Sequence, residues 1–103
     1  MDSEPNKPTD PPAPAGEPTY MLFVAGDGHN SVLARQNLDD MRHEAWFGDG
    51  QVEVVDVLDD FERAARHNIL LTPTLLRTEP HPRLRLVGNL SNRQRVRDLF
   101  GGT

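Results

Sequence analysis

The chain has 103 residues, sixteen of them acidic and eleven basic, with a formal net charge of −5 at neutral pH. This length suits one small domain. The complete absence of cysteine excludes disulfide bridges, thiolate metal sites and every thiol-based redox reaction. No run of about 18 apolar residues is present, so we predict no membrane-spanning helix and expect a cytoplasmic protein.

The first 18 residues contain six of the nine prolines and almost no large apolar side chain. Such a segment cannot bury enough surface to offset the entropy of ordering, so we predict a disordered, proline-rich tail over residues 1–18. The segment also lacks the basic start and the apolar stretch of a secretory signal. The folded domain is therefore predicted to span residues 19–103.

Charge is divided unevenly along the chain. Residues 1–62 carry fourteen acidic and three basic residues, whereas residues 63–103 carry eight arginines and two acidic residues. Planar guanidinium groups form forked hydrogen bonds with carboxylates and phosphates. The basic half is predicted either to meet such groups on a partner or to neutralise the acidic half, within the fold or between subunits.

The predicted elements begin with a short apolar run, residues 20–25, that suits a strand covered on both faces. After a glycine-containing turn, Asn30 or Ser31 is predicted to cap an amphipathic helix that ends near Trp46. A second strand is expected over residues 52–57, because β-branched residues dominate there.

A short helix is predicted next. Asp59, with Glu62 three residues later, has the spacing of a capping box. The apolar side chains of this helix, Phe61, Ala64 and Ala65, are expected to supply its buried face.

The second half of the chain is predicted to form a hairpin and a last helix. Pro73 interrupts the apolar run 69–76 and cannot donate to a central ladder, so a strand is expected to begin at Pro73 or just after it. Alternation over residues 83–87 predicts an edge strand that pairs with it. Ser91 with Gln94 has the spacing of a second capping box before the last helix.

The predicted order is strand, helix, strand, helix, strand, strand, helix. A parallel βαβ start followed by a hairpin and a terminal helix is the α/β, thioredoxin-like arrangement, βαβαββα. The Thr72-Pro73 step falls where that fold places a cis-proline before its third strand.

Four segments of the folded part resemble the KaiB family: LFVAG at 22–26 with Asn30-Ser31 after it, VVDVL at 54–58, ILLTPTL at 69–75, and VGNLS at 87–91 followed by Arg93 and Val96. The resemblance covers residues 19–100. It implies a non-enzymatic clock or timing protein that binds the ring of a KaiC-type ATPase. Further clock proteins or histidine-kinase output proteins are implied as additional partners.

The resemblance also implies two folds, because KaiB proteins are similar in having a tetrameric ground state and a thioredoxin-like monomer that binds the ATPase. The second half of the chain rearranges between the two, so self-association as a homotetramer or dimer is implied. Because the last helix has strong start signals, we expect this chain to favour the thioredoxin-like fold more than a strongly switching member does.

Partner contact is implied for seven residues of the rearranging half: Phe61, Arg63, Ala64, His67, Asn68, Arg83 and Arg85. Hinges for the change of fold are implied at Thr72, Pro73, Gly88, Asn89 and Leu90. Lysine or aspartate is typical of cyanobacterial members where this chain has Asp59, Asn68 and Asn89. These departures favour a divergent or non-cyanobacterial member, either with a different KaiC-like partner or acting as a stress or signalling adaptor.

Other functions are less favoured by the residues. Gly26 and Gly28 lack the third glycine and the lysine of a phosphate-binding loop, so they predict a tight turn. The four histidines lack metal-site spacing, and we predict no metal and no cofactor. A cysteine-free glutathione-type enzyme would have to use a hydroxyl such as that of Ser31.

Nucleic-acid binding is the remaining alternative. It would use the arginines of the basic half, which are Arg83, Arg85, Arg93, Arg95 and Arg97. Nucleic-acid-binding proteins usually combine such residues with exposed aromatics and a net positive charge. This chain is acidic, and Tyr20, Phe23, Trp46 and Phe100 are all predicted to lie in the core.

Overall fold

The computed structural model describes residues 19–47, 50–79 and 81–101. Its elements follow the predicted order: β2 (Thr19–Val24), α1 (His29–Met41), β3 (Gln51–Asp56), α2 (Phe61–Arg66), β4 (Thr74–Glu79), β5 (Leu84–Val87), α3 (Arg93–Val96) and the π-helical turn η1 (Arg97–Gly101). The predicted tail, residues 1–18, lies outside the described residues.

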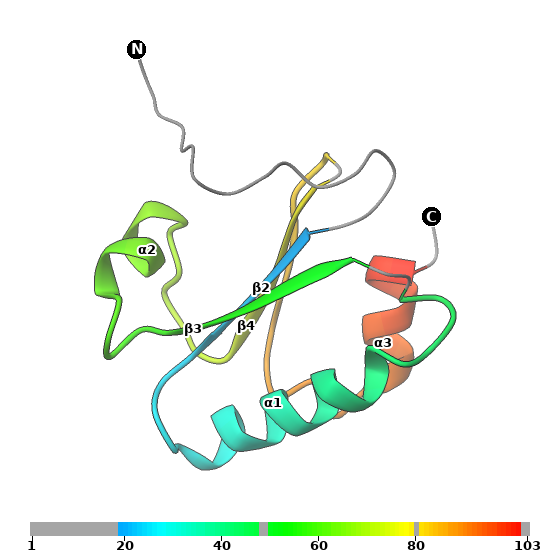
Figure 1. Ribbon diagram of the computed structural model, residues 1–103, viewed down its shortest axis with the longest axis horizontal. Helices are drawn as coiled ribbons and strands as arrows, with labels where there is room; N and C mark the ends of the chain where they lie inside the picture. Colours follow the sequence, from blue (N-terminus) through cyan, green and yellow to red (C-terminus); the bar gives the residue numbers. More distant parts are fainter. Residues whose placement is uncertain (1–18, 48–49, 80, 102–103) are drawn as a thin grey trace.

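The four strands form one sheet in the order β3-β2-β4-β5. Strand β2 runs parallel to β3, with Leu22 opposite Val54, and antiparallel to β4, with Leu22 also opposite Leu75. Strand β5 completes the hairpin with β4 (Figure 1). The Thr72-Pro73 peptide bond is cis. The predicted thioredoxin-like α/β fold is confirmed.

The larger core lies between the sheet and the helices α1 and α3. Alternate residues of β2 point into it, because side chains of a strand alternate between its two faces. Tyr20, Leu22 and Val24 pack there with residues from α1, the hairpin and the last helix, including Leu38 and Phe100. Tyr20, near the start of the described chain, and Phe100, near its end, therefore belong to one apolar cluster.

The opposite face of the sheet has a smaller core. Met21 and Phe23 of β2 pack there with Val55 of β3 and Leu76 of β4. The only described helix on this side is α2, which contributes Ala64. Figure 1 shows α2 set apart from α1 and α3, beside the end of β3. A helix of six residues covers only part of this apolar face.

Aromatic side chains link the turn after α1 to the last helical turn. The ring of Phe47 stacks on Tyr20 with 4.5 Å between centroids, and Phe100 meets Tyr20 edge-on at 5.7 Å. Trp46 lies against Phe47 at 5.7 Å. A side chain added at Gly101 would clash with the indole of Trp46, so close packing requires glycine there.

The start and the end of α1 both differ from prediction. The helix ends at Met41 rather than near Trp46, because residues 42–47 form turns that bring Trp46 and Phe47 back onto the core. Its N-cap is Gly28, not Asn30 or Ser31. The Ser31 hydroxyl instead accepts a hydrogen bond from the Ala25 N–H at 3.0 Å.

Two further predicted caps were wrong by one residue. Asp60, not Asp59, caps α2, and its carboxylate accepts a hydrogen bond from the Arg63 N–H at 3.3 Å. Asn92, not Ser91, caps α3 and accepts from the Arg95 N–H at 3.1 Å. Adjacent polar residues can serve equally well as caps, and local packing selects between them.

The buried face predicted for α2 was also mostly wrong. Only Ala64 is buried, whereas Phe61 and Ala65 are exposed. In the described part of the chain, no helix has the length and apolar character needed to cross a membrane.

We predict that Gly101→Ala destabilises the fold by about 1–3 kcal/mol, because the added methyl group overpacks against Trp46. Chemical denaturation measures this change. In a Trp46→Ala background the same substitution should cost much less, because the clashing ring is absent. Equal costs in both backgrounds would show that Gly101 and Trp46 are not coupled.

Candidate functional site

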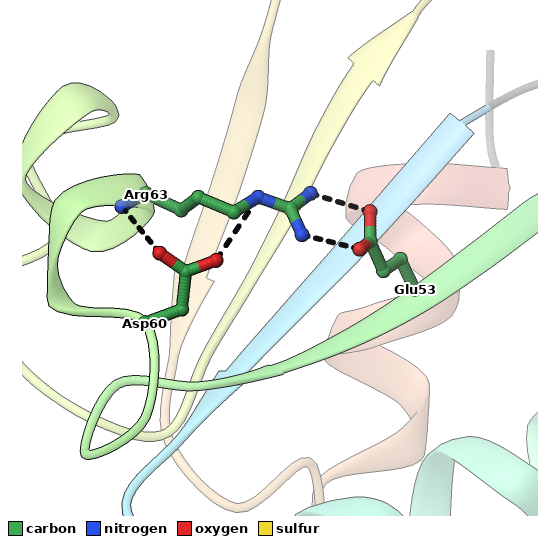
Figure 2. Close-up of polar contacts among 3 residues, drawn as sticks. All are labelled: Glu53, Asp60 and Arg63. Carbon is green, nitrogen blue, oxygen red and sulfur yellow. Dashed lines mark hydrogen bonds and ion pairs between the residues drawn. The ribbon is translucent and has the colours of Figure 1, made fainter. Parts of the chain in front are cut away.

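Helix α2 is held to the sheet by a bidentate ion pair. Both terminal guanidinium nitrogens of Arg63 donate to the carboxylate of Glu53 on β3 (Figure 2). The Nε of Arg63 also lies 3.9 Å from the Asp60 carboxylate that caps the helix. Hydrogen bonding from Arg63 lowers the pKa of Glu53. These contacts fix the start of α2 against the edge strand.

The end of α2 is held by Arg85 of β5. Its guanidinium donates to the backbone carbonyls of His67, at 2.9 Å, and Asn68, at 3.1 Å. Asn68 adopts a left-handed conformation with φ of 58°, which asparagine tolerates better than most residues. The structure thus brings together three of the seven residues implied for partner contact, although 18 positions separate His67 from Arg85 in sequence.

His67 lies half-buried below this contact. Its ring centroid is 5.9 Å from that of Phe23, and its Nδ1 atom has no hydrogen-bond partner among the described residues. Burial lowers the pKa of His67, and the charges of Arg83, Arg63, Arg66 and Arg85 lower it further. Burial and the nearby arginines therefore both favour the neutral form of the imidazole.

Exposed apolar side chains flank both ends of α2. Leu58 is 72% exposed and Phe61 73% exposed where the chain enters the helix, and Leu70 is 90% and Leu71 62% exposed where it leaves. We call these four residues, together with Arg66, His67, Asn68, Arg83 and Arg85, the α2 surface. Large apolar side chains gathered at the surface mark interaction sites more often than isolated ones do.

The implied contact residues do not all offer the same access. Phe61, Arg83 and Arg85 are exposed, but Ala64 is 4% exposed and packs in the smaller core. Arg63 is engaged by Glu53. Leu58, Leu70 and Leu71 were not singled out for contact from sequence. Their position could have indicated them, since large apolar residues in the connections on either side of a short helix have few places to be buried.

The five implied hinge residues meet at one end of the hairpin. The Gly88 N–H donates to the Pro73 carbonyl at 2.9 Å, which joins the two segments directly. Asn89 donates through its side chain to Asn30 at 3.0 Å. Gly88 has a φ of 132° and Leu90 a φ of 67°, a conformation that costs a leucine about 1–2 kcal/mol.

The turn between β2 and α1 is shaped by the Asp56 carboxylate. The Gly26 N–H and the Leu58 N–H both donate to the Asp56 carboxylate, at 3.1 and 3.0 Å, so this acid is used in shaping the turns. Asp27 and His29 are exposed. Among the described residues, no group of three or more histidine, aspartate and glutamate side chains could hold a metal ion.

Comparison with known proteins identifies the family. The KaiB domain profile matches residues 21–101, which include every described element except the first two residues of β2. The chain belongs to the KaiB family. It is 40% identical over 80 residues to the circadian clock oscillator protein KaiB of Thermostichus vulcanus, covering 76% of this chain and 74% of that protein. KaiB of Prochlorococcus marinus strain MIT 9303 is also 40% identical, covering 76% and 67%.

Solved structures agree with the thioredoxin-like fold of this KaiB-family chain. The N-terminal domain of Synechococcus elongatus SasA superposes with a TM-score of 0.64 at 21% identity, covering 90% of this chain and 89% of that one. Thioredoxin from Trypanosoma brucei brucei gives a TM-score of 0.65 at 20% identity, covering 80% and 74%. These similarities concern the fold alone.

The lowered pKa of His67 predicts a pH effect on the stability of the KaiB-family fold. The unfolded chain binds a proton at this position near pH 6.5, whereas the folded chain binds it only at lower pH. Stability should therefore fall as pH decreases from above 6.5 toward the folded pKa, and it should fall less in His67→Asn. Denaturation at pH 7.5 and 5.5 tests this, and identical losses in both proteins would contradict it.

Proposed function

We propose that this chain is a non-enzymatic clock or timing protein that binds the ring of a KaiC-type ATPase through the α2 surface. The observation that carries the proposal is the exposure of Leu58, Phe61, Leu70 and Leu71 around one short helix. Family membership supports the type of partner. The proposal places the chain in the cytoplasm together with the ATPase.

The energetics of the α2 surface favour a protein partner. Burying a large apolar side chain yields about 1.5–3 kcal/mol, so the four exposed residues are suited to form the centre of an interface. Arg66 and Arg83 are exposed beside them and would lie at its rim. The fixed position of α2, held by Glu53 at its start and Arg85 at its end, reduces the ordering cost of binding.

A non-enzymatic role fits the turn that carries the redox cysteines in thioredoxins. Here that turn contains Asp27, Gly28 and His29, and the whole chain lacks a thiol. The only hydroxyl at the start of α1, that of Ser31, is buried and accepts the Ala25 N–H. This arrangement offers no free nucleophile for a glutathione-type reaction.

The second part of the proposal is a change of fold at the end of the hairpin, with self-association into a tetramer or dimer in the other state. Leu90 is in a left-handed conformation that a different arrangement of the last helix would relieve. Helix α3 itself has only four residues before it widens into η1. Two folds of one sequence need differ by only a few kcal/mol for both to be populated.

Charge substitutions on the α2 surface test the docking. Leu70→Asp and Phe61→Asp should each weaken binding to a KaiC-type ATPase at least about tenfold, because they place a charge in an apolar contact. Size-exclusion chromatography with ATP present provides the measurement. Val32→Asp is the matched control, since Val32 is 37% exposed on α1 and should not affect binding.

Loss of binding in all three variants would point to general damage and would remove support for the α2 surface. Full binding by Leu70→Asp and Phe61→Asp would show that another face meets the ATPase.

Substitution at Gly88 tests the balance between folds. Gly88→Ala should destabilise the thioredoxin-like fold by about 1 kcal/mol or more, because φ is 132°, although no atom lies within 4 Å of the added methyl group. Sedimentation velocity should show a larger assembled fraction than in the parent chain. Gly28→Ala, at φ of −55°, is the control. An unchanged distribution in Gly88→Ala would contradict a second fold of nearby energy.

A further inference from the structure

The three arginines of the α2 surface, Arg66, Arg83 and Arg85, lack an acidic partner in the part of the chain that the structure describes. Arg66 on α2 and Arg83 just before β5 are exposed, and neither forms an ion pair with a described residue. Glu62 precedes Arg66 by one helical turn, yet the two are not paired. Two positive charges are therefore presented to solvent on the same side of the sheet.

Hydrogen bonds from Arg85 to the carbonyls of His67 and Asn68 place the start of β5 beside the end of α2, so Arg66 and Arg83 are brought to the same end of this helix. In agreement with this, the pKa of His67 is lowered by burial first and then by the charges of Arg83, Arg63, Arg66 and Arg85. Their acidic neighbours Glu53 and Asp60 are engaged by Arg63, and the side chains packed below, Phe23 and Leu76, are uncharged. Arg85 is occupied by two backbone carbonyls. Backbone carbonyls carry no net charge, so Arg85 still adds to the local positive charge, while Arg66 and Arg83 are the two arginines of this group whose guanidinium groups have no hydrogen-bond or ion-pair partner among the described residues.

We propose that Arg66, Arg83 and the His67 ring form a docking site for an acidic segment of a protein partner, whose carboxylates are held by the two guanidinium groups. This inference rests on the proposed role of the α2 surface and names the chemistry of what binds there. Guanidinium groups bind carboxylates through forked, charge-assisted hydrogen bonds. Leu70 and Leu71 lie beyond the same end of α2, where they can receive apolar residues of the segment.

A protein segment fits this site better than a nucleic acid does. Single-stranded nucleic acids bind through basic grooves with exposed aromatic side chains on which bases stack. Among the described residues of the α2 surface, the exposed aromatic side chain is Phe61, at the opposite end of α2, and the His67 ring is half-buried.

Docking of carboxylates at this site takes up a proton. In the free chain burial lowers the pKa of His67, and the nearby arginines disfavour its charged form further. An anion placed over Arg66 and Arg83 cancels part of their field, which raises the pKa of His67 in the complex. By linkage, binding is then tighter at pH 6 than at pH 7.5. The acidic groups of the segment remain ionised throughout this range.

The experiment is an NMR titration of the full chain with an octaglutamate peptide at low salt, observing backbone amides and the His67 ring. We expect shifts centred on Arg66, His67 and Arg83, a dissociation constant at least about threefold lower at pH 6 than at pH 7.5, and a higher His67 pKa with peptide bound. Arg66→Ala/Arg83→Ala should abolish these effects. Arg35→Ala/Arg42→Ala, which removes the same charge from exposed positions of α1 and its C-cap, should retain them.

Equal loss in both double variants would show a general charge effect and overturn the site. Absence of shifts around His67 in the parent chain, or tighter binding of octathymidylate at the same residues, would also overturn it. The titration contains no ATPase, so its failure would leave the docking of an ATPase on Phe61 and Leu70 to be decided by the chromatography above.

Discussion

The burial of both faces of β2 is the constraint on which the rest of the structure depends. This central strand is apolar at five successive positions, Tyr20 to Val24, all of them buried. One face is covered by α1 and the last helix, whose buried residues, among them Ala34, Leu38, Val96 and Phe100, join Tyr20 and its neighbours in the larger core. The other face relies on α2, a helix of six residues that buries only Ala64. The two layers of the fold are therefore unequal.

This inequality explains why the candidate site lies where it does. A short helix must be held by polar contacts when its apolar contacts are few, and the Arg63–Glu53 pair and the Arg85 bonds to backbone carbonyls provide them. In the connections on either side of α2, Val57 and Ile69 pack against the smaller core, whereas their neighbours Leu58, Leu70 and Leu71 remain exposed. The same features that fix α2 on the sheet produce an apolar, arginine-bordered surface suited to a protein partner.

Much of the fold could be predicted from sequence, because hydrophobic periodicity reports which faces are buried. The continuous run at 20–25 and the alternation at 83–87 marked a central and an edge strand, and the structure confirms both. Helix boundaries were less predictable. Asp60 and Asn92 act as caps where Asp59 and Ser91 were expected, because neighbouring polar residues have similar capping energies. The turns that follow the end of α1 were not predicted, because they depend on the packing of Trp46 against Gly101, which is distant in sequence.

The candidate site was predictable only in outline. Phe61, Arg83 and Arg85 were singled out, but sequence periodicity assigned Phe61 to a core that α2 is too short to form. The contact of Arg85 with His67 and Asn68 depends on the end of α2 lying beside β5, which no local pattern contains. The arginines around His67 likewise come from two elements that are distant in sequence.

Methyl NMR of the full chain, labelled at leucine and valine and mixed with a KaiC-type ATPase and ATP, tests the central claim most directly. The account predicts that signals of Leu58, Leu70 and Leu71 shift or broaden on binding, because these exposed side chains enter the interface. The signal of Val32 on α1 should stay unchanged. Perturbation confined to Val32 and its neighbours on α1, with the three leucines unaffected, would contradict docking through the α2 surface.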